Sequence, residues 1–115
     1  MPAVDRGSTP NGPYLAARLQ ERARELGVEL STQVHTYLHR SSFGVKVDWP
    51  FDTTGDGIHC EVADTGDSVI VAEPRPREVR IEQAVTYVLA RVQGSEPDEA
   101  MSVAKPPRRG WRRRP

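Results

Sequence analysis

The sequence predicts a small α+β protein with the element order ααβββα, in which helices cover a small three-stranded antiparallel meander. Three observations support this prediction. Residues 13–26 place apolar side chains at helical spacing, residues 43–73 alternate apolar and polar side chains in short runs, and residues 81–92 carry the strongest helical periodicity in the chain. Because each predicted element has one apolar side, helices and sheet are expected to bury those sides against each other.

The length of 115 residues allows one domain. We expect residues 13–93 to form it, between a disordered N-terminus (1–12) and a Pro/Arg-rich basic tail (94–115). Cys60 is the only cysteine, which excludes an intramolecular disulfide and fits a reducing compartment. No apolar run is long enough for a signal peptide or a membrane span, so the cytoplasm is the expected location.

The two N-terminal helices are expected on either side of Gly27. Pro13 suits the first position of a helix, and Gly27 is a natural C-terminal stop. Ser31 is typical of the N-cap of a second, shorter helix. The β-branched and aromatic residues that follow also suit a strand, and this alternative stays open. The apolar side of the first helix is Leu15, Leu19, Ala23 and Leu26, and that of the second is Val34, Tyr37 and Leu38.

Three strands are expected after Ser42, in residues 43–49, 58–63 and 68–73. The first strand ends at Pro50, and glycine-containing turns connect the three. The pair Pro74 and Pro76 is expected to end the sheet.

A long helix is expected after these prolines. Its apolar residues recur at i, i+3, i+4, i+7, i+8 and i+11, and Gly94 closes it. These apolar residues are Ile81, Ala84, Val85, Val88, Leu89 and Val92.

Charge is divided between the body of the chain and its end. The whole chain is neutral, with 16 basic and 16 acidic residues. Residues 1–104 hold ten basic and sixteen acidic residues, and the last eleven residues hold six basic residues and no acidic one. An acidic body with a basic tail suits binding of a polyanion, of a protein partner or of the chain itself.

The tail is the candidate nucleic-acid-binding site. Arginine pairs with phosphate in a bidentate manner, tryptophan stacks on an exposed base, and proline keeps the segment extended. If all six cations neutralise phosphates of a single strand, the log–log salt slope is about −4. The residues assigned to this site are Lys105, Arg108, Arg109, Trp111, Arg112, Arg113 and Arg114.

An acidic stretch between positions 48 and 67 is the candidate surface for a protein partner. It contains six carboxylates with no basic residue between them, which suits a solvated sheet edge or a dock for the tail. A symmetric homodimer through the first helix or the sheet edge also stays open. The six residues are Asp48, Asp52, Asp56, Glu61, Asp64 and Asp67.

Two metal-binding motifs are incomplete. The run from His59 to Glu61 begins like the His-x-Glu motif of a zinc deaminase, but that chemistry needs a further cysteine pair and the chain has one cysteine. Residues 52–57 begin like a calcium loop, yet Ala63 stands at position 12, where a bidentate glutamate is required. A glycine-rich turn explains the second motif, and an inward-facing Cys60 explains the first.

The histidines do not complete a site in sequence either. His35 and His39 have the i, i+4 spacing of a helical metal pair, but Thr36 replaces the glutamate of the metalloprotease motif. Zinc needs three or four ligands. An enzyme would be indicated by a pocket that holds His35, His39 and His59 together. We therefore expect no catalytic residue, metal or cofactor.

Residues 81–101 resemble an ANTAR domain, the RNA-binding antitermination module of bacterial regulators. The resemblance lies in Ile81-Glu82-Gln83-Ala84, Leu89-Ala90-Arg91 and Pro97-Asp98-Glu99-Ala100, and covers about twenty of the 115 residues. It implies RNA as the ligand. The chain has Val85-Thr86 where the family usually has Lys-Gly and Met101 where it has an aromatic residue. The family's third helix is expected to be missing, because Pro106 and Pro107 stop any continuation.

The sequence as a whole predicts a small non-enzymatic binding or regulatory protein that binds nucleic acid, with RNA preferred, through its Arg-rich tail. The alternative is a protein–protein interaction adaptor that uses its acidic body, with the tail self-docking or solubilising. No membrane partner is expected.

Overall fold

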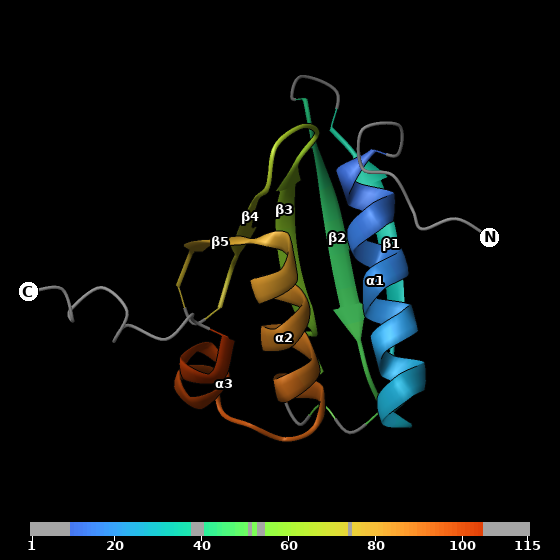
Figure 1. The fold of residues 1–115 in the computed structure, drawn as a ribbon, viewed down its shortest axis with the longest axis vertical. Coiled ribbons are helices and arrows are strands. Elements are labelled where there is room, and N and C mark those ends of the chain that lie inside the picture. The colour runs from blue at the N-terminus through green and yellow to red at the C-terminus, as the bar shows by residue number, and fades with distance from the viewer. Residues whose placement is uncertain (1–9, 38–40, 51, 53–54, 74, 105–115) are drawn as a thin grey trace, which may run out of the picture.

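The computed structural model describes residues 10–37, 41–50, 52, 55–73 and 75–104. One helix precedes a five-stranded antiparallel sheet, and two helices follow it (Figure 1). In chain order the elements are α1 (Asn11–Leu26), β1 (Ser31–Thr36), β2 (Ser42–Asp48), β3 (Ile58–Ala63), β4 (Ser68–Val71), β5 (Arg77–Arg80), α2 (Ile81–Val92) and α3 (Pro97–Ala104). The α+β class is confirmed, and the observed order is αβββββαα.

The sheet is a continuous meander in the order β1-β2-β3-β4-β5, with β1 and β5 at its two edges. Helices α1 and α2 lie side by side on one face, α1 over β1 and β2 and α2 over β4 and β5 (Figure 1). Helix α3 packs on α2. The described helices therefore leave the opposite face of the sheet uncovered, and this face is called the open face below.

The segment expected to form a second helix is strand β1, so that prediction is wrong. Val34 lies opposite Val45 of β2, and Thr32 and Thr36 lie opposite other residues of the same strand. The alternating β-branched residues favour an extended chain, and the neighbouring strand satisfies its backbone, which outweighs the helix-capping signal of Ser31. Leu38 lies outside the described residues.

The sheet also continues past the proline pair, so the prediction of three strands is wrong. Arg77–Arg80 forms β5, in which Val79 lies opposite Val69 of β4. Pro76 lies in the connection between these strands, where no ladder hydrogen bond is required of it. The antiparallel meander itself is as predicted, with one strand added at each edge.

The helix boundaries follow the glycine signals closely. Gly27 ends α1 in the left-handed conformation, with φ of 71°, and the Val28 amide donates to the Ala23 carbonyl at 3.0 Å. Helix α2 matches the predicted long helix. Residues 97–104 were expected within the tail, but they form α3, whose Ala100, Met101 and Ala104 are buried.

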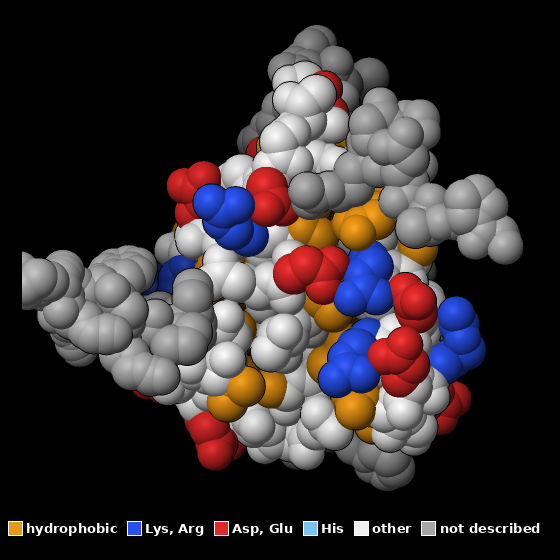
Figure 2. Space-filling model, in the orientation of Figure 1, with side chains coloured by type: hydrophobic (Ala, Val, Ile, Leu, Met, Phe, Trp, Pro, Cys, Tyr) orange, Lys and Arg blue, Asp and Glu red, His pale blue; other side chains and the backbone are white. Residues whose placement is uncertain are grey.

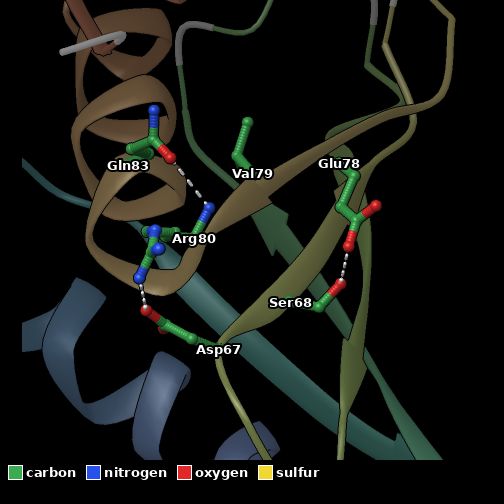
Figure 3. Close-up of a pocket in the computed structure, with 6 residues that line it drawn as sticks. All are labelled: Asp67, Ser68, Glu78, Val79, Arg80 and Gln83. Atoms are coloured by element: carbon green, nitrogen blue, oxygen red, sulfur yellow. Dashed lines mark hydrogen bonds and ion pairs between the residues drawn. The ribbon is translucent and has the colours of Figure 1, made fainter.

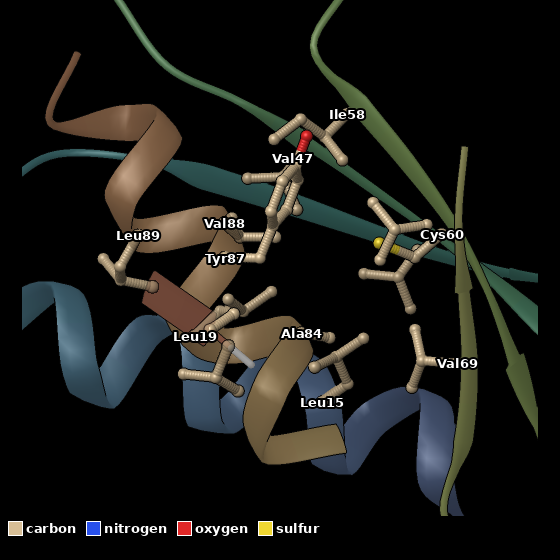
Figure 4. Packing of buried hydrophobic residues seen from close by; sticks show 14 of the residues in the cluster. Leu15, Leu19, Val47, Ile58, Cys60, Val69, Ala84, Tyr87, Val88 and Leu89 are labelled. Carbon is tan, nitrogen blue, oxygen red and sulfur yellow. The ribbon is translucent and has the colours of Figure 1, made fainter. Parts of the chain in front are cut away.

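The core lies between the helix layer and the sheet (Figure 4). Leu15 and Leu19 of α1 and Ala84 and Val88 of α2 meet the inward residues of the strands. These inward residues are fully buried and come from β2, β3 and β4, namely Val45, Val47, Ile58, Cys60, Val62, Val69 and Val71. The apolar faces of α1 and α2 thus meet the buried strand residues on one side of the sheet, and the open face carries mostly polar side chains, with the exposed Ile70 among them.

Candidate functional site

The strand register defines which side chains share the open face. Residues directly opposite each other in an antiparallel sheet point to the same side, and the register runs across all five strands. One row on the open face contains His35, Gly44, Glu61, Ile70 and Glu78, one residue from each strand in order. This row of two carboxylates, a histidine, a glycine and an exposed isoleucine has no described helix above it, so it is accessible to a ligand.

Three rings gather at the β1 side of this face. The centroids of the His35 and His59 rings are 5.6 Å apart, and the His35 and Tyr37 rings meet edge to face at the same centroid distance. The Tyr37 hydroxyl is hydrogen-bonded to Nε2 of His59 at 3.3 Å. These three residues, called the ring cluster below, join the first and third strands across the second.

Gly44 makes the ring cluster geometrically feasible. A Cβ atom on this residue of β2 would overlap the His35 imidazole and come within 2.7 Å of the Tyr37 hydroxyl. The backbone of Gly44 does not have positive φ, so its conformation is one that any residue adopts. Glycine is therefore needed here for space above the sheet rather than for backbone freedom.

The polar groups around the ring cluster have mixed charge. The Ser42 hydroxyl donates to Glu61 at 2.9 Å, and Nζ of Lys46 lies 3.7 Å from Asp48. Further along the face, the Ser68 hydroxyl donates to Glu78 at 2.7 Å. Hydroxyls, carboxylates, a lysine and rings thus make up a polar surface that suits contact with a ligand more than bond-breaking chemistry.

The structure places His35 on a strand and brings it close to a different histidine, His59. His35 lies on a strand, so the helical i, i+4 relation to His39 does not apply, and His39 lies outside the described residues. His35 instead approaches His59. In the described part of the chain, no group of three or more His, Cys, Asp or Glu residues is placed to hold a metal ion. Sequence reasoning missed the importance of Tyr37 and Gly44, because it placed residues 31–37 on a helix.

The six acidic residues of the candidate partner surface are spread along the sheet. Asp48, Asp52 and Asp56 lie at the β2–β3 end, Asp64 and Asp67 lie at the opposite β3–β4 end, and Glu61 lies between them on the open face. Their use by a partner stays a prediction. The seven tail residues proposed to bind nucleic acid, Lys105 to Arg114, lie outside the described residues.

Asp67 has a structural role at the start of α2. Its carboxylate accepts a hydrogen bond from the Ile81 amide at 3.1 Å and pairs with Arg80 at 3.4 Å. Gln83 accepts from the Arg80 amide at 3.0 Å. A hollow of about 440 Å³ lies beside β5 (Figure 3). Its lining residues are Asp67, Ser68, Glu78, Val79, Arg80 and Gln83. Since the polar groups in the hollow already bond to one another, the hollow is a weaker candidate than the ring cluster.

A second charged network lies at the other end of α2. Glu73, which follows β4, accepts hydrogen bonds from the Tyr87 hydroxyl at 2.7 Å and from Nε of Arg91. Arg91 also donates to the Ser95 carbonyl at 2.9 Å and lies 5.8 Å from the centroid of the Trp49 ring. The Glu73 carboxylate raises the pKa of Arg91. Burial raises the pKa of Tyr87, so both groups keep their protons and hold the helix to the sheet.

The outer side of the helix layer is covered by ion pairs. Arg18 of α1 binds Glu82 of α2 at 2.8 Å and Glu21 at 2.7 Å, and Arg22 binds Glu25. In Figure 2, acidic and basic side chains alternate over this face. Among the described residues, such balanced charge gives no single-sign patch for a polyanion on the helix side.

Comparison with protein-family models, with curated proteins and with solved structures finds no match for this chain. The described helices are all too short or too polar to cross a membrane. The open face and the charge of the tail are therefore the features that bear on function.

Proposed function

We propose that this is a non-enzymatic nucleic-acid-binding protein that holds a single strand, with RNA preferred, between the open face and the basic tail. The observation that carries the proposal is the ring cluster, formed by His35, Tyr37 and His59 over Gly44 on a sheet face that the described helices leave uncovered. Stacking of a base on an aromatic ring contributes about 1–3 kcal/mol and tolerates any base.

The basic tail supplies the positive charge for binding phosphates that the open face lacks. The face carries both carboxylates and cations, so it attracts phosphates weakly, whereas the last eleven residues carry six positive charges. Rings that stack bases and arginines that pair with phosphates are the two ingredients of single-strand binding. The resemblance of residues 81–101 to an ANTAR domain favours RNA over DNA within this proposal.

The test is fluorescence anisotropy of labelled RNA and DNA oligomers across a salt series, with variants that separate the two parts of the site. Gly44→Ala displaces His35 and Tyr37, whose exposed ring ends can swing into solvent, so the fold is retained while the cluster is lost. We expect its affinity for RNA to fall by about tenfold or more, the loss of roughly one stacked base. Replacing the five tail arginines with glutamine should flatten the salt slope.

The matched control is Ile70→Ala, which trims an exposed side chain on the same face but outside the ring cluster. It should bind like the wild type. The absence of binding by the wild-type chain to both nucleic acids at low salt would refute the proposal. Unchanged RNA affinity in Gly44→Ala would show that the ring cluster is not part of the binding site.

A protein–protein interaction adaptor is the second candidate, and one observation favours it. Glu61 and Glu78 lie on either side of Ile70 in the open-face row, which places two carboxylates around an exposed apolar side chain. This arrangement repels phosphate and suits a basic protein surface. A partner captured by the wild type and lost in Glu61→Lys, with no nucleic-acid binding by either protein, would favour the adaptor.

A further inference from the structure

We propose that the chain forms a symmetric homodimer in which strand β1 pairs antiparallel with β1 of a second copy. The two five-stranded sheets then join into one continuous sheet. This inference is independent of the proposed function, because it concerns the sheet edge and not the ligand of the open face.

The two sheet edges differ in how they are protected against pairing. Exposed edge strands are normally protected by charged residues, by proline, by a bulge or by shortness. Strand β5 has such protection, since it has four residues, three of them charged, and follows Pro76. Strand β1 has six residues, Ser-Thr-Gln-Val-His-Thr, with no lysine, arginine, carboxylate or proline, and it pairs with β2 in unbroken register.

The outer edge of β1 has no strand beside it among the described residues, although its residues suit strand pairing. Five of its six residues are exposed, and Thr32 is half-buried. An edge with free backbone groups and high β-propensity is a template for another strand. We infer that β1 of a second copy pairs with this edge. A strand without lysine, arginine or carboxylate residues meets no like-charge repulsion when it pairs with itself.

The exposure of Val34 indicates the register of the proposed pairing. Val34 is 39% exposed and is one of four large exposed hydrophobic residues in the described chain. It lies at the centre of β1 and on the helix side of the sheet, opposite the buried Val45. A two-fold axis perpendicular to the sheet keeps all helices on one side, and it brings Val34 against Val34 of the partner subunit. In this register Gln33 lies opposite His35 of the partner subunit, on the open face.

Sedimentation velocity over a concentration series is the direct test. The chain has a mass of 12.8 kDa, and we expect the wild type to approach twice that mass as its concentration rises. Val34→Lys places two ammonium groups against each other at the axis and should shift the protein to the monomer. The control is Val103→Lys in α3, where the native residue is 62% exposed and remote from β1, and it should dimerise like the wild type.

A cysteine experiment tests the register without relying on the lysine variant. Val34→Cys should form an intermolecular disulfide on mild oxidation, because directly opposite residues have Cα atoms about 4.5–5.5 Å apart. Gln33→Cys should not, since its two copies are offset by two residues, at about 7–8 Å. Native Cys60 is buried and does not compete.

Two outcomes would overturn the proposal. The first is a wild-type chain that remains a monomer at every concentration. The second is a dimer that persists in Val34→Lys while Val34→Cys cross-links no faster than Gln33→Cys, which would place the interface elsewhere.

Discussion

At the scale of single residues, the environment of Cys60 shifts the pKa of its thiol, but its geometry is not that of a catalytic residue. Its side chain is fully buried on β3 among the valines of the core. Burial, reinforced by the negative charge of Glu73, raises the pKa of the thiol from 9.0 to about 12. A thiol that stays protonated is a poor nucleophile, so Cys60 acts as a small apolar residue.

The shifted pKa of Cys60 predicts a loss of stability at alkaline pH. The folded protein holds the thiol proton more tightly than the unfolded chain does, so this contribution is complete below pH 9 and is lost as the pH rises from 9 towards about 12. Urea unfolding at several pH values measures it. Cys60→Ala should be less stable at neutral pH by about 1–2 kcal/mol, but its stability should fall less steeply above pH 9. Equal slopes for the two proteins would contradict the assignment.

Residue identity alone could not reveal the ring cluster. His35 and His59 are 24 positions apart in the sequence, and each has an ordinary polar-face explanation on its own. They meet because β2 lies between their strands and Gly44 leaves space above it. A glycine inside a predicted strand signals a close approach of other atoms, and this was the one local clue to the site.

At the scale of elements, Glu73 connects the end of β4 to α2. The carboxylate receives hydrogen bonds from Tyr87 and Arg91, which are separated by one helical turn. Both charged partners are largely shielded, with side-chain exposures of 22% for Glu73 and 14% for Arg91. Removing one member of a shielded network leaves the other without its counter-charge, which costs far more than breaking a surface pair.

Glu73→Gln should therefore lower the free energy of unfolding by about 2 kcal/mol, since the amide still accepts from Tyr87 but no longer balances Arg91. The matched control is Glu25→Gln, which breaks the exposed pair with Arg22 and should cost under about 0.5 kcal/mol. Chemical denaturation of the three proteins compares the two losses. Equal losses would show that the network contributes no more than a surface ion pair.

Elements with one clear signal could be predicted, and those with competing signals could not. Helices α1 and α2 have uninterrupted apolar periods and glycine stops, and both lie where their residues indicate. Strand β1 has a helix-capping residue and β-branched residues in the same six positions, and only pairing with β2 decides between them. Strand β5 and helix α3 are short, and they have too few apolar residues to be predicted alone. Strand β5 is defined by its pairing with β4, and α3 by its packing on α2.

At the scale of the whole molecule, the fold is one-sided. Every described helix is on one side of the sheet or packs on a helix that is, and the ion pairs on this side are balanced. The open face holds the rings, and the last eleven residues of the neutral chain hold six basic residues and no acidic one. In the proposed β1-to-β1 dimer, the two open faces form one surface with the two ring clusters close to the axis, and the proposed function assigns two basic tails to one ligand.

This arrangement predicts that salt dependence grows with the length of the ligand. An oligonucleotide that reaches one tail should give a log–log slope of about −4, and one that spans the dimer and meets twelve cations should approach about −8. Val34→Lys, as a monomer, should give the shallower slope at both lengths. The same anisotropy series measures all four combinations. A slope of about −4 for the long ligand, in a protein shown by sedimentation to be dimeric, would mean that the two tails do not share one strand, because cations that bind separate strands do not add in a single slope.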